Sequence, residues 1–466
     1  MERTGHKDLL TKLAKEYSRY APKSAALNKR ATQVQVDGGS HAMRLLEPFP
    51  PRIVVAEGAW LRDEDGHDIL DFWQGHHANV LGHNPKVVTS ALAAAFETRF
   101  GLLTGFADRL QVEVAEILCQ QTGAERVRFT TSGSLATMYA VLLAKAFTQR
   151  RLVMKVGGGW HGAQPWGLKG VSFCAARGTG FQGVESEGLP QAIPDEVLVT
   201  RFNDTTMLRD DFRQHGDQVA CFIVEPFIGA GGFMAASREY LQTARQLTLH
   251  YGALLVFDEV VSGFRFRAGD AGALYGIRPD LAAFGKAIGG GMPVAAVAGR
   301  AEVMELVGRK GGSRVKFSGG SYSCHPASLL AAKAQMEYLV AHETEVYRQL
   351  TTLGELTRQT MESAFAKEGI HALSSGYGND VLPGSSISML LFPYREDFQL
   401  LTPEDAHDPA LTDIELREKV LPLALLLENV HVVHGSGSVT TAHTEADIAF
   451  LGEACQRVAK RLKNVR

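Results

Sequence analysis

The sequence predicts an α/β protein built on a parallel or mostly parallel β-sheet with helices on both faces. From about residue 86, apolar strand-like runs alternate with helix-like segments, as in RVRFTTSG followed by LATMYAVLLAKAF, and LQTARQLTLHYG followed by ALLVFDEV. Parallel neighbours need a crossover connection, usually a helix, and strands covered on both faces read as unbroken apolar runs. The chain has 466 residues, which is too long for a single hydrophobic core, so more than one lobe is expected.

Three segments are expected along the chain. Residues 1–85 begin with an amphipathic helix and continue as a small sheet, because RIVVAEGAWLRDEDGHDILDFW alternates around a turn at Asp65-Gly66. Residues 86–330 hold the alternating strands and helices and are predicted to form a large α/β domain. Residues 331–466 change to helix, mixed strands and the polar insertion REDFQLLTPEDAHDPALTD, which predicts a smaller α+β domain.

Composition and charge argue against several classes of function. Hydrophobic residues make up 45% and charged residues 21% of the chain, as in an ordinary globular protein. The net charge of −3 argues against nucleic acid or a membrane surface as a partner, since both favour a basic patch. No apolar run reaches the roughly 20 residues of a membrane-spanning helix, and MERTGHKDLLTKLAKEY lacks the apolar core of a signal peptide. The 5 cysteines form no C-x-x-C pair, so reduced thiols and a cytoplasmic location are expected.

Two of the predicted strands end in segments that suit a flat, anionic ligand. In FTTSGSLATMYA, Gly133 and Ser134 lie between a strand and a helix, where free backbone N–H groups and the helix dipole attract an anion such as phosphate. In GGGWHGAQP, the indole of Trp160 could cover a flat ring. Each has an ordinary alternative, a helix cap for the Ser-Gly-Ser turn and a packed aromatic for Trp160. In open α/β sheets, however, ligands bind beyond the carboxyl ends of the strands, where both segments are expected.

Buried acids and a single lysine end the other strands. VEP places Glu225 and FDEV places Asp258 at such ends, and LAAFGKAIGGGMP places Lys286 about one strand–connection–strand unit after Asp258. One acid at a strand end is usually a helix cap, but an anion site, a flat aromatic, an acid and a lysine in one row match pyridoxal 5′-phosphate. That cofactor needs a lysine for its Schiff base, a carboxylate that keeps its pyridine nitrogen protonated, an anion site and a flat partner. The sequence therefore predicts pyridoxal 5′-phosphate as the cofactor, with Asp258 and Lys286 as the catalytic residues.

The same segments resemble the class III aminotransferases, pyridoxal-phosphate enzymes of fold type I, and in particular the branch that holds glutamate-1-semialdehyde aminomutases and β-amino-acid aminotransferases. The resemblance runs from about residue 38 to 455 and rests on DEDGHDILDFW, LGHNPKVV, GAERVRFTTSGS, GGWHG, VEP, LLVFDEVVSGFR and FGKAIGGGMPVAAVAGR. It implies a mostly parallel seven-stranded sheet sandwiched by helices, a smaller α+β domain built from both chain ends, and a homodimer with shared active sites. It also implies residue roles: a Schiff base on Lys286, a pyridine-nitrogen contact from Asp258, ring faces covered by Trp160 and Val260, phosphate contacts from Gly133 and Ser134, Glu225 near the phenolic side, and a hydroxyl from Ser321 to the phosphate in the other subunit.

The chain departs from the pattern of this family at several points. Leu135 stands where the family usually has glutamate, and His325 where it usually has asparagine, which could loosen the surroundings of the cofactor. Trp160 itself stands where tyrosine or phenylalanine is usual. The segment WHGAQPWGLKGVSF is bulkier and more apolar than the gating loop of an aminomutase, which weighs against that reaction.

The substrate pocket is expected to take a small-molecule amine and a 2-oxo acid. Arg44 lies roughly where this branch places an arginine for a substrate carboxylate, and a surface or salt-bridge role is the open alternative. His76, in WQGHHANVLGH, is expected to line the pocket, and no metal site is expected because adjacent histidines point apart and no third ligand is evident. With Trp73, Trp160 and Trp166 nearby, the predicted donor is an apolar or aromatic amine or a β-amino acid, and the acceptor is pyruvate or 2-oxoglutarate.

Other functions stay open. A glutamate-1-semialdehyde 2,1-aminomutase or a racemase on the same fold would keep the same lysine and aspartate. A pyridoxal-dependent transcription regulator would need a basic winged-helix segment, for which the N-terminal segment is too short. The predicted function is therefore a transaminase, with the aminomutase and the racemase as alternatives.

Overall fold

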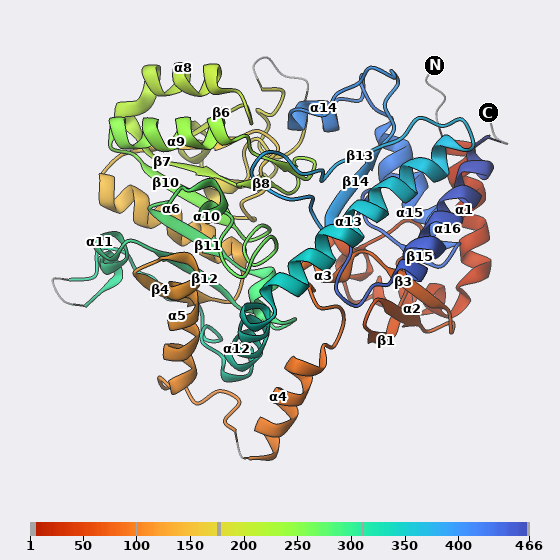
Figure 1. Ribbon diagram of the computed structural model, residues 1–466, viewed down its shortest axis with the longest axis horizontal. Helices are drawn as coiled ribbons and strands as arrows, with labels where there is room; N and C mark the ends of the chain where they lie inside the picture. The colour runs from red at the N-terminus through yellow and green to blue at the C-terminus, as the bar shows by residue number, and fades with distance from the viewer. Residues whose placement is uncertain (1–5, 99, 175–178, 310–311, 464–466) are drawn as a thin grey trace.

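The chain forms two lobes, a large one on the left of Figure 1 and a smaller one on the right. The computed structural model describes residues 6–98, 100–174, 179–309 and 312–463. The middle of the chain builds the large lobe, and the two ends of the chain lie together in the small one (Figure 1). Within the described ranges, no helix is long and apolar enough to cross a membrane.

The large lobe is built around a seven-stranded sheet with the strand order β4, β12, β11, β10, β7, β5, β6. Neighbouring strands run parallel except at β12, which is antiparallel to both β11 and β4. The strands are β4 (Arg126–Thr130), β5 (Leu152–Val156), β6 (Val197–Thr200), β7 (Val219–Val224), β10 (Leu254–Glu259), β11 (Leu281–Phe284) and β12 (Ala295–Gly299). This mostly parallel sheet confirms the predicted fold class.

Side chains of the central strand β10 alternate between the two faces of the sheet. Val256 packs in the hydrophobic cluster that includes helix α6 (Gly133–Thr148), whereas Phe257 packs in the cluster on the other face. Because successive side chains of a strand point to opposite faces, Asp258 continues the α6 face and Glu259 continues the other. The period of the strand therefore decides which of the two adjacent carboxylates lies on the side of the α6 N-terminus.

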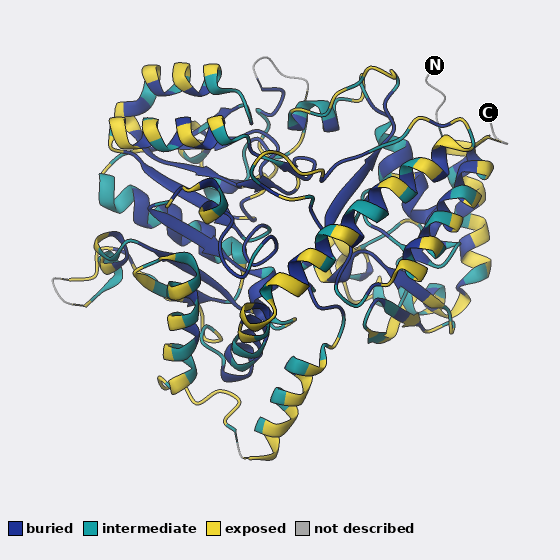
Figure 2. Cartoon of the chain, in the orientation of Figure 1, coloured by how far each residue is buried: buried dark blue, intermediate teal, exposed yellow. Residues whose placement is uncertain are grey.

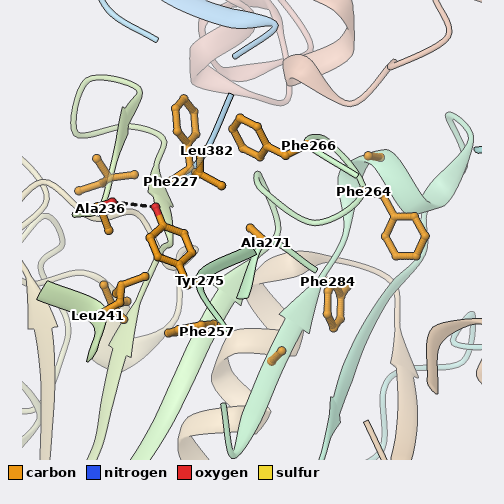
Figure 3. Close-up of a cluster of buried hydrophobic side chains, with 14 of the residues drawn as sticks. Phe227, Ala236, Leu241, Phe257, Phe264, Phe266, Ala271, Tyr275, Phe284 and Leu382 are labelled. Atoms are coloured by element: carbon orange, nitrogen blue, oxygen red, sulfur yellow. Dashed lines mark hydrogen bonds between the residues drawn. The ribbon is translucent and has the colours of Figure 1, made fainter. Parts of the chain in front are cut away.

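Helices cover both faces of the large sheet, and their inner sides are buried (Figure 2). Helix α6 covers one face. The other face is covered by α5 (Arg109–Thr122), α8 (Thr205–His215), α9 (Arg238–Tyr251) and α12 (Pro326–Ala341). The core on this second face is rich in aromatic rings (Figure 3), and there the hydroxyl of Tyr275 donates a hydrogen bond of 2.7 Å to the carbonyl of Ala236.

The small lobe combines both chain ends in one hydrophobic core. Its four-stranded sheet has the order β1 (Ile53–Glu57), β2 (Trp60–Asp63), β3 (Asp68–Asp71), β15 (Val430–His431), and its three-stranded sheet the order β13 (Leu373–Ser374), β14 (Ile387–Leu391), β16 (Ser436–Ser438). Its main helices are α1 (Lys7–Tyr20), α2 (Pro22–Ala31), α13 (Glu343–Ala366), α15 (Leu421–Leu426) and α16 (Glu445–Lys463). Leu13 of α1 and Leu451 of α16 are buried in the same cluster. A division into segments at residues 85 and 330 stays a prediction.

Shorter elements connect the lobes or cover the edges of the large sheet. They are α3 (Gln74–His77), α4 (Lys86–Glu97), α7 (Ala192–Asp195), β8 (Phe227–Ile228), β9 (Met234–Ala235), α10 (Gly272–Tyr275), α11 (Ala301–Met304), α14 (Pro403–His407) and a π-helical turn at Leu416–Val420.

Candidate active site

The carboxyl ends of five parallel strands bring the predicted site residues to one edge of the large sheet. Strand β4 leads to Gly133, β5 to Trp160 and β7 to Glu225, while β10 contains Asp258 and β11 leads to Lys286. Because these strands point the same way, their ends lie along one edge, as expected for ligand sites of open α/β sheets.

Asp258 is buried and paired with a histidine. Its side chain is 3% exposed, and its Oδ2 lies 2.8 Å from Nδ1 of His161, which is fully buried. Its Oδ1 accepts a hydrogen bond of 3.0 Å from the backbone N–H of Val260. Burial lowers the pKa of His161, and the neighbouring Asp258 opposes that shift. His161 therefore orients the carboxylate; the sequence placed it beside Trp160, but the partnership with Asp258 was missed because it joins different strands.

Lys286 follows the end of β11 on a backbone in the left-handed region, with φ of 45°. Its side chain is half-buried, and among the described residues its amine has no hydrogen-bond or salt-bridge partner. Burial lowers the pKa of Lys286, the carboxylates of Asp258 and Glu225 oppose the shift, and the cation of Arg265 adds to it. A lysine amine that is partly desolvated and unbonded is suited to nucleophilic attack.

Glu225 fixes the backbone around the candidate ring site. It is 2% exposed. Its Oε1 accepts a hydrogen bond of 3.1 Å from the backbone N–H of Trp160, and its Oε2 one of 2.8 Å from the backbone N–H of Gly229. Burial and the charge of Asp258 raise the pKa of Glu225 to about 8. The indole of Trp160 is 39% exposed, so a large part of this ring is free to contact a ligand.

The N-terminus of α6 forms a close cradle with two other strand-end segments. Ser132 caps the helix by accepting a hydrogen bond from the backbone N–H of Leu135. A Cβ at Gly133 would lie 2.9 Å from both methyl groups of Val260. A Cβ at Gly162, whose φ is 83°, would lie 2.5 Å from Cα of Ser134. Only glycine allows these approaches, so the first turn of α6 lies directly against the segments that carry Val260 and Trp160.

A fully buried lysine, Lys155 of β5, organises the loop that carries Trp160 and His161. Its Nζ donates hydrogen bonds to the carbonyls of Gly159 at 2.9 Å, Gly167 at 3.1 Å and Lys169 at 2.8 Å. Burial lowers the pKa of Lys155 to about 7, although nearby acids oppose the shift. Lys155 was not predicted from the sequence, although a lysine inside the apolar run RLVMKVGG was a signal that could have identified it.

Arg44 and His76, the two predicted substrate residues, lie close enough to each other to interact electrostatically, and His76 also interacts with Lys286. Burial, together with the charges of Lys286, His41 and Arg44, lowers the pKa of His76 to about 3. The ring of His76 lies 4.4 Å from the ring of His41 and 4.4 Å from that of Trp73, measured between centroids. The structure therefore brings His76 near Lys286 and groups His41 and Arg44 with His76.

The expectation that three tryptophans make the pocket apolar is wrong for Trp166. Its indole N–H donates a hydrogen bond of 2.9 Å to Glu196, and the ammonium of Lys145 lies 5.3 Å from its ring centroid. Lys145 lies in the last turn of α6, at the end opposite the cradle. Trp73 is buried and packs against His76 and the ring of His77. The bulk of WHGAQPWGLKG therefore turns partly away from the candidate site.

The remaining predicted positions lie at the margin of the site. Ser321 lies in an exposed turn, and its hydroxyl has no hydrogen-bond partner within the described part of the chain. Leu135 packs in the hydrophobic cluster of α6, and His325 is the residue that precedes α12. The described residues contain no group of three or more histidine, cysteine or acidic side chains that could hold a metal ion.

The polar insertion of the small lobe reaches the same edge of the sheet. In α14, His407 Nε2 lies 3.0 Å from the carbonyl oxygen of Ala230, in the loop that follows Glu225. Glu404 forms an ion pair of 3.4 Å with Arg201. The insertion therefore contacts the loops that follow β7 and β6 at this edge of the sheet.

Comparison with known proteins identifies the family. Residues 46–376 match the model of the family described as aminotransferase class-III. A glutamate-1-semialdehyde 2,1-aminomutase of Lachnoclostridium phytofermentans is 36% identical over 71% of this chain and 76% of its own length. A β-phenylalanine aminotransferase of Variovorax paradoxus has a similar structure, with a TM-score of 0.83, 27% identity and 97% of each chain covered. A transaminase solved with pyridoxal phosphate bound has a TM-score of 0.82 and 28% identity, over 95% of this chain and 98% of its own. The chain therefore belongs to the class III aminotransferases, pyridoxal-phosphate-dependent enzymes of fold type I.

Proposed function

We propose that this chain binds pyridoxal 5′-phosphate at the carboxyl edge of the large sheet and moves amino groups with it. The observation that supports this best is the buried Asp258–His161 pair, at 2.8 Å, on the same sheet edge as the amine of Lys286, which has no partner among the described residues. When bound, this cofactor supplies an electrophilic carbonyl for amines and withdraws electrons from the carbon that carries the amine. Helix α6 begins at Gly133, so its N-terminal backbone N–H groups lie at this strand end, which suits a phosphate.

Each catalytic residue has a task that its surroundings support. Asp258, oriented by His161, would hold the proton on the ring nitrogen. Lys286 would attack the aldehyde carbon and, after displacement by the substrate, take up the proton from the amine-bearing carbon of the substrate. Its lowered pKa enlarges the neutral fraction that can accept this proton. Glu225, with its pKa raised to about 8, would add little negative charge beside the phenolic oxygen of the cofactor.

The other contacts would hold the cofactor in place. Backbone N–H groups of Gly133 and Ser134 would bind the phosphate, as is common at helix N-termini. Trp160, which follows β5, and Val260, which follows Asp258 at the end of β10, would cover opposite faces of the ring. The fixed surroundings of these residues keep the ring aligned with Lys286, which is how binding geometry lowers a reaction barrier.

The amino substrate is proposed to carry a carboxylate. Arg44 is an exposed guanidinium whose charge acts on His76, and a guanidinium binds a carboxylate through two parallel hydrogen bonds. The apolar pocket inferred from three tryptophans is not retained, since Trp166 hydrogen-bonds Glu196. An amino acid that presents its carboxylate to Arg44 therefore fits this site better than a purely apolar amine.

A glutamate-1-semialdehyde 2,1-aminomutase is the second candidate. The relative that is 36% identical to this chain bears that name. The bulky segment WHGAQPWGLKGVSF no longer weighs strongly against this reaction, because its Trp166 packs against Lys145 at the far end of α6. The two reactions need the same lysine and aspartate. They differ in whether the amino group passes to a second molecule or returns to a neighbouring carbon of the same one.

Product analysis separates the two candidates. The holoenzyme is incubated either with glutamate-1-semialdehyde alone or with 3-amino-3-phenylpropanoate and pyruvate, and Lys286→Ala serves as the matched inactive control. Alanine formed from pyruvate without 5-aminolevulinate supports the transaminase, and 5-aminolevulinate formed without an acceptor supports the aminomutase. If a panel of amino acids and amines exchanges no amino group at all, the proposed function is wrong.

We also propose that the enzyme acts as a homodimer in which Ser321 contributes to the site of the other subunit. The support is that Ser321 is exposed and its hydroxyl unbonded within the described chain. A second support is a group of exposed apolar side chains, which a partner subunit would cover: Phe96, Leu102, Leu103, Phe106 and Tyr322.

A further inference from the structure

We propose that His41 and His76 form an imidazole pair that, beside Arg44, hydrogen-bonds the carboxylate of the amino substrate and so selects amino acids over simple amines. This inference rests on the proposed function and specifies the substrate class of the same site. From the sequence, His76 was expected only to line the pocket, and His41 had no predicted role.

An unsatisfied nitrogen is the first support. Nε2 of His76 is buried and has no hydrogen-bond partner among the described residues. The His76 ring nevertheless packs against two other rings, with an angle between ring planes of 65° to His41 and of 53° to Trp73. A buried polar atom without a partner destabilises the folded protein, so native proteins usually provide it with one. Since Lys286 is close enough to shift the pKa of His76, a ligand bound near the lysine can supply the missing partner.

The backbone that carries His76 is the second support. Gln74, Gly75, His76 and His77 have φ values of 44°, 59°, 63° and 60°, so four consecutive residues adopt the left-handed region. For residues other than glycine this conformation is strained, and such strain persists only where surrounding contacts enforce it. The left-handed turn therefore indicates that the fold holds the His76 side chain in a particular direction.

Two buried charged residues enforce this left-handed turn. Asp71 accepts hydrogen bonds of 2.9 Å from the backbone N–H groups of both Trp73 and Gln74. On the other side, the guanidinium of Arg265 donates to the carbonyl of His77, and its Nε donates to the carbonyl of Val261 at 2.9 Å. Arg265 thereby ties the turn to the strand-end loop that follows Asp258.

The electrostatics of the group favour an anion. Burial and the neighbouring titratable groups Lys286, His41 and Arg44 keep the pKa of His76 at about 3, so the ring is neutral near pH 7. Burial and Arg44 likewise lower the pKa of His41. Two neutral imidazoles can each donate one N–H, and Arg44 supplies the positive charge. A cationic ligand or a metal ion would be repelled by the same charges, whereas a carboxylate gains both hydrogen bonds and attraction.

The test compares donors that differ only by a carboxylate. Two pairs are used, 3-amino-3-phenylpropanoate with 1-phenylethylamine, and 4-aminobutanoate with propylamine. The reaction of holoenzyme with donor is followed without an acceptor, by the loss of the visible absorbance of the bound cofactor. This half-reaction excludes any effect on binding of the 2-oxo acid and yields a maximal rate and a half-saturating concentration for each donor.

The variants are His76→Phe, His41→Phe and His76→Gln, with His250→Phe on the exposed side of α9 as the matched control. We expect each phenylalanine variant to raise the half-saturating concentration of the acids by about 10- to 100-fold, the loss expected for hydrogen bonds to a charged group. The maximal rate and both amines should change less than about threefold, and His76→Gln should recover part of the loss because its amide also donates.

Several outcomes would overturn the inference. Equal losses for acids and amines would mean that the histidines hold the fold, and unchanged acids would mean that Arg44 alone binds the carboxylate. Because His41 is exposed, His41→Phe tests the pair even if His76→Phe fails to fold. A wild-type enzyme that consumes all four donors, with acids and amines equally affected in the variants, contradicts only the histidine pair. A wild-type enzyme that consumes none of them contradicts the proposed function as well.

Discussion

Replacing Gly162 by alanine tests whether the first turn of α6 is the phosphate site. The added Cβ would lie 2.5 Å from Cα of Ser134, so backbone and not a flexible side chain must move. The left-handed φ of 83° costs an alanine about 1–2 kcal/mol, and the overpacked contact adds about 1–3 kcal/mol. If the loop yields by moving away from α6, the loss falls on cofactor binding. At about 1.4 kcal/mol per factor of ten, the affinity for pyridoxal 5′-phosphate should fall by about 30-fold to a few thousandfold.

Gly66→Ala is the matched control for this experiment. Gly66 has a similar φ of 93°, but nothing lies within 4 Å of the place where its Cβ would be. It should therefore show the backbone cost of about 1–2 kcal/mol in stability without a change in cofactor affinity. Cofactor binding is measured by absorbance titration of the apoprotein, and stability by denaturant unfolding of both apoproteins. If Gly162→Ala matches Gly66→Ala in both measurements, Ser134 does not lie against Gly162 and the phosphate site is elsewhere.

Four further predictions concern the catalytic residues, the subunit contact and stability. Lys286→Ala should abolish turnover and remove the visible absorbance of the bound cofactor, and steady-state activity in this variant would refute the assignment. Asp258→Asn should lower turnover by about 10²–10³-fold while the cofactor still binds, and a near-normal rate would mean that another group serves the ring nitrogen. Co-expressed Lys286→Ala and Ser321→Asp subunits, each inactive alone, should recover about a quarter of the wild-type activity, because random pairing gives mixed dimers in half of the cases with one complete site each; no recovery would contradict a shared site. Contacts with His434 and Arg417 hold the pKa of Glu418 at about 2, against an ordinary value of 4.5. This is worth ~3 kcal/mol above pH 4.5, lost as the pH falls through about 2, so Glu418→Gln should destabilise the protein at pH 7 and much less at pH 2, whereas exposed Glu187→Gln should not change stability at either pH.

Residues at strand ends were predictable because they depend on local pattern. Asp258 and Lys286 each close an apolar run, and the structure places both at the carboxyl edge of the sheet. The same pattern did not say which of Asp258 and Glu259 lies on the α6 face. That choice follows from which face the preceding residues bury, and Val256 and Phe257 are equally apolar in the sequence. Only the packing of α6 separates them.

Contacts between distant segments could not be predicted in this way. Lys155 binds three carbonyls of the loop that follows it, which requires the loop to fold back over a buried ammonium. Trp166 was expected near the pocket because its neighbours in the sequence are there, but Glu196 provides a partner for its indole N–H on the other side of the lobe. Hydropathy carries no information on where such partners lie, since hydrogen bonds between strands and loops depend on the relative placement of whole elements.

The sequence by itself determined the fold class, the family and the chemistry at the strand ends, because apolar periodicity and short motifs are local properties of the chain. Only the tertiary structure decided which polar groups meet. It paired His161 with Asp258 at 2.8 Å, and it brought His41 to within 4.4 Å of His76 on a left-handed turn. His161 and Asp258 come from segments that are remote in the sequence. The turn that carries His76 is held by contacts with Asp71 and Arg265. Both interactions depend on burial and on the relative positions of segments that are distant in the sequence, which no single stretch of residues encodes.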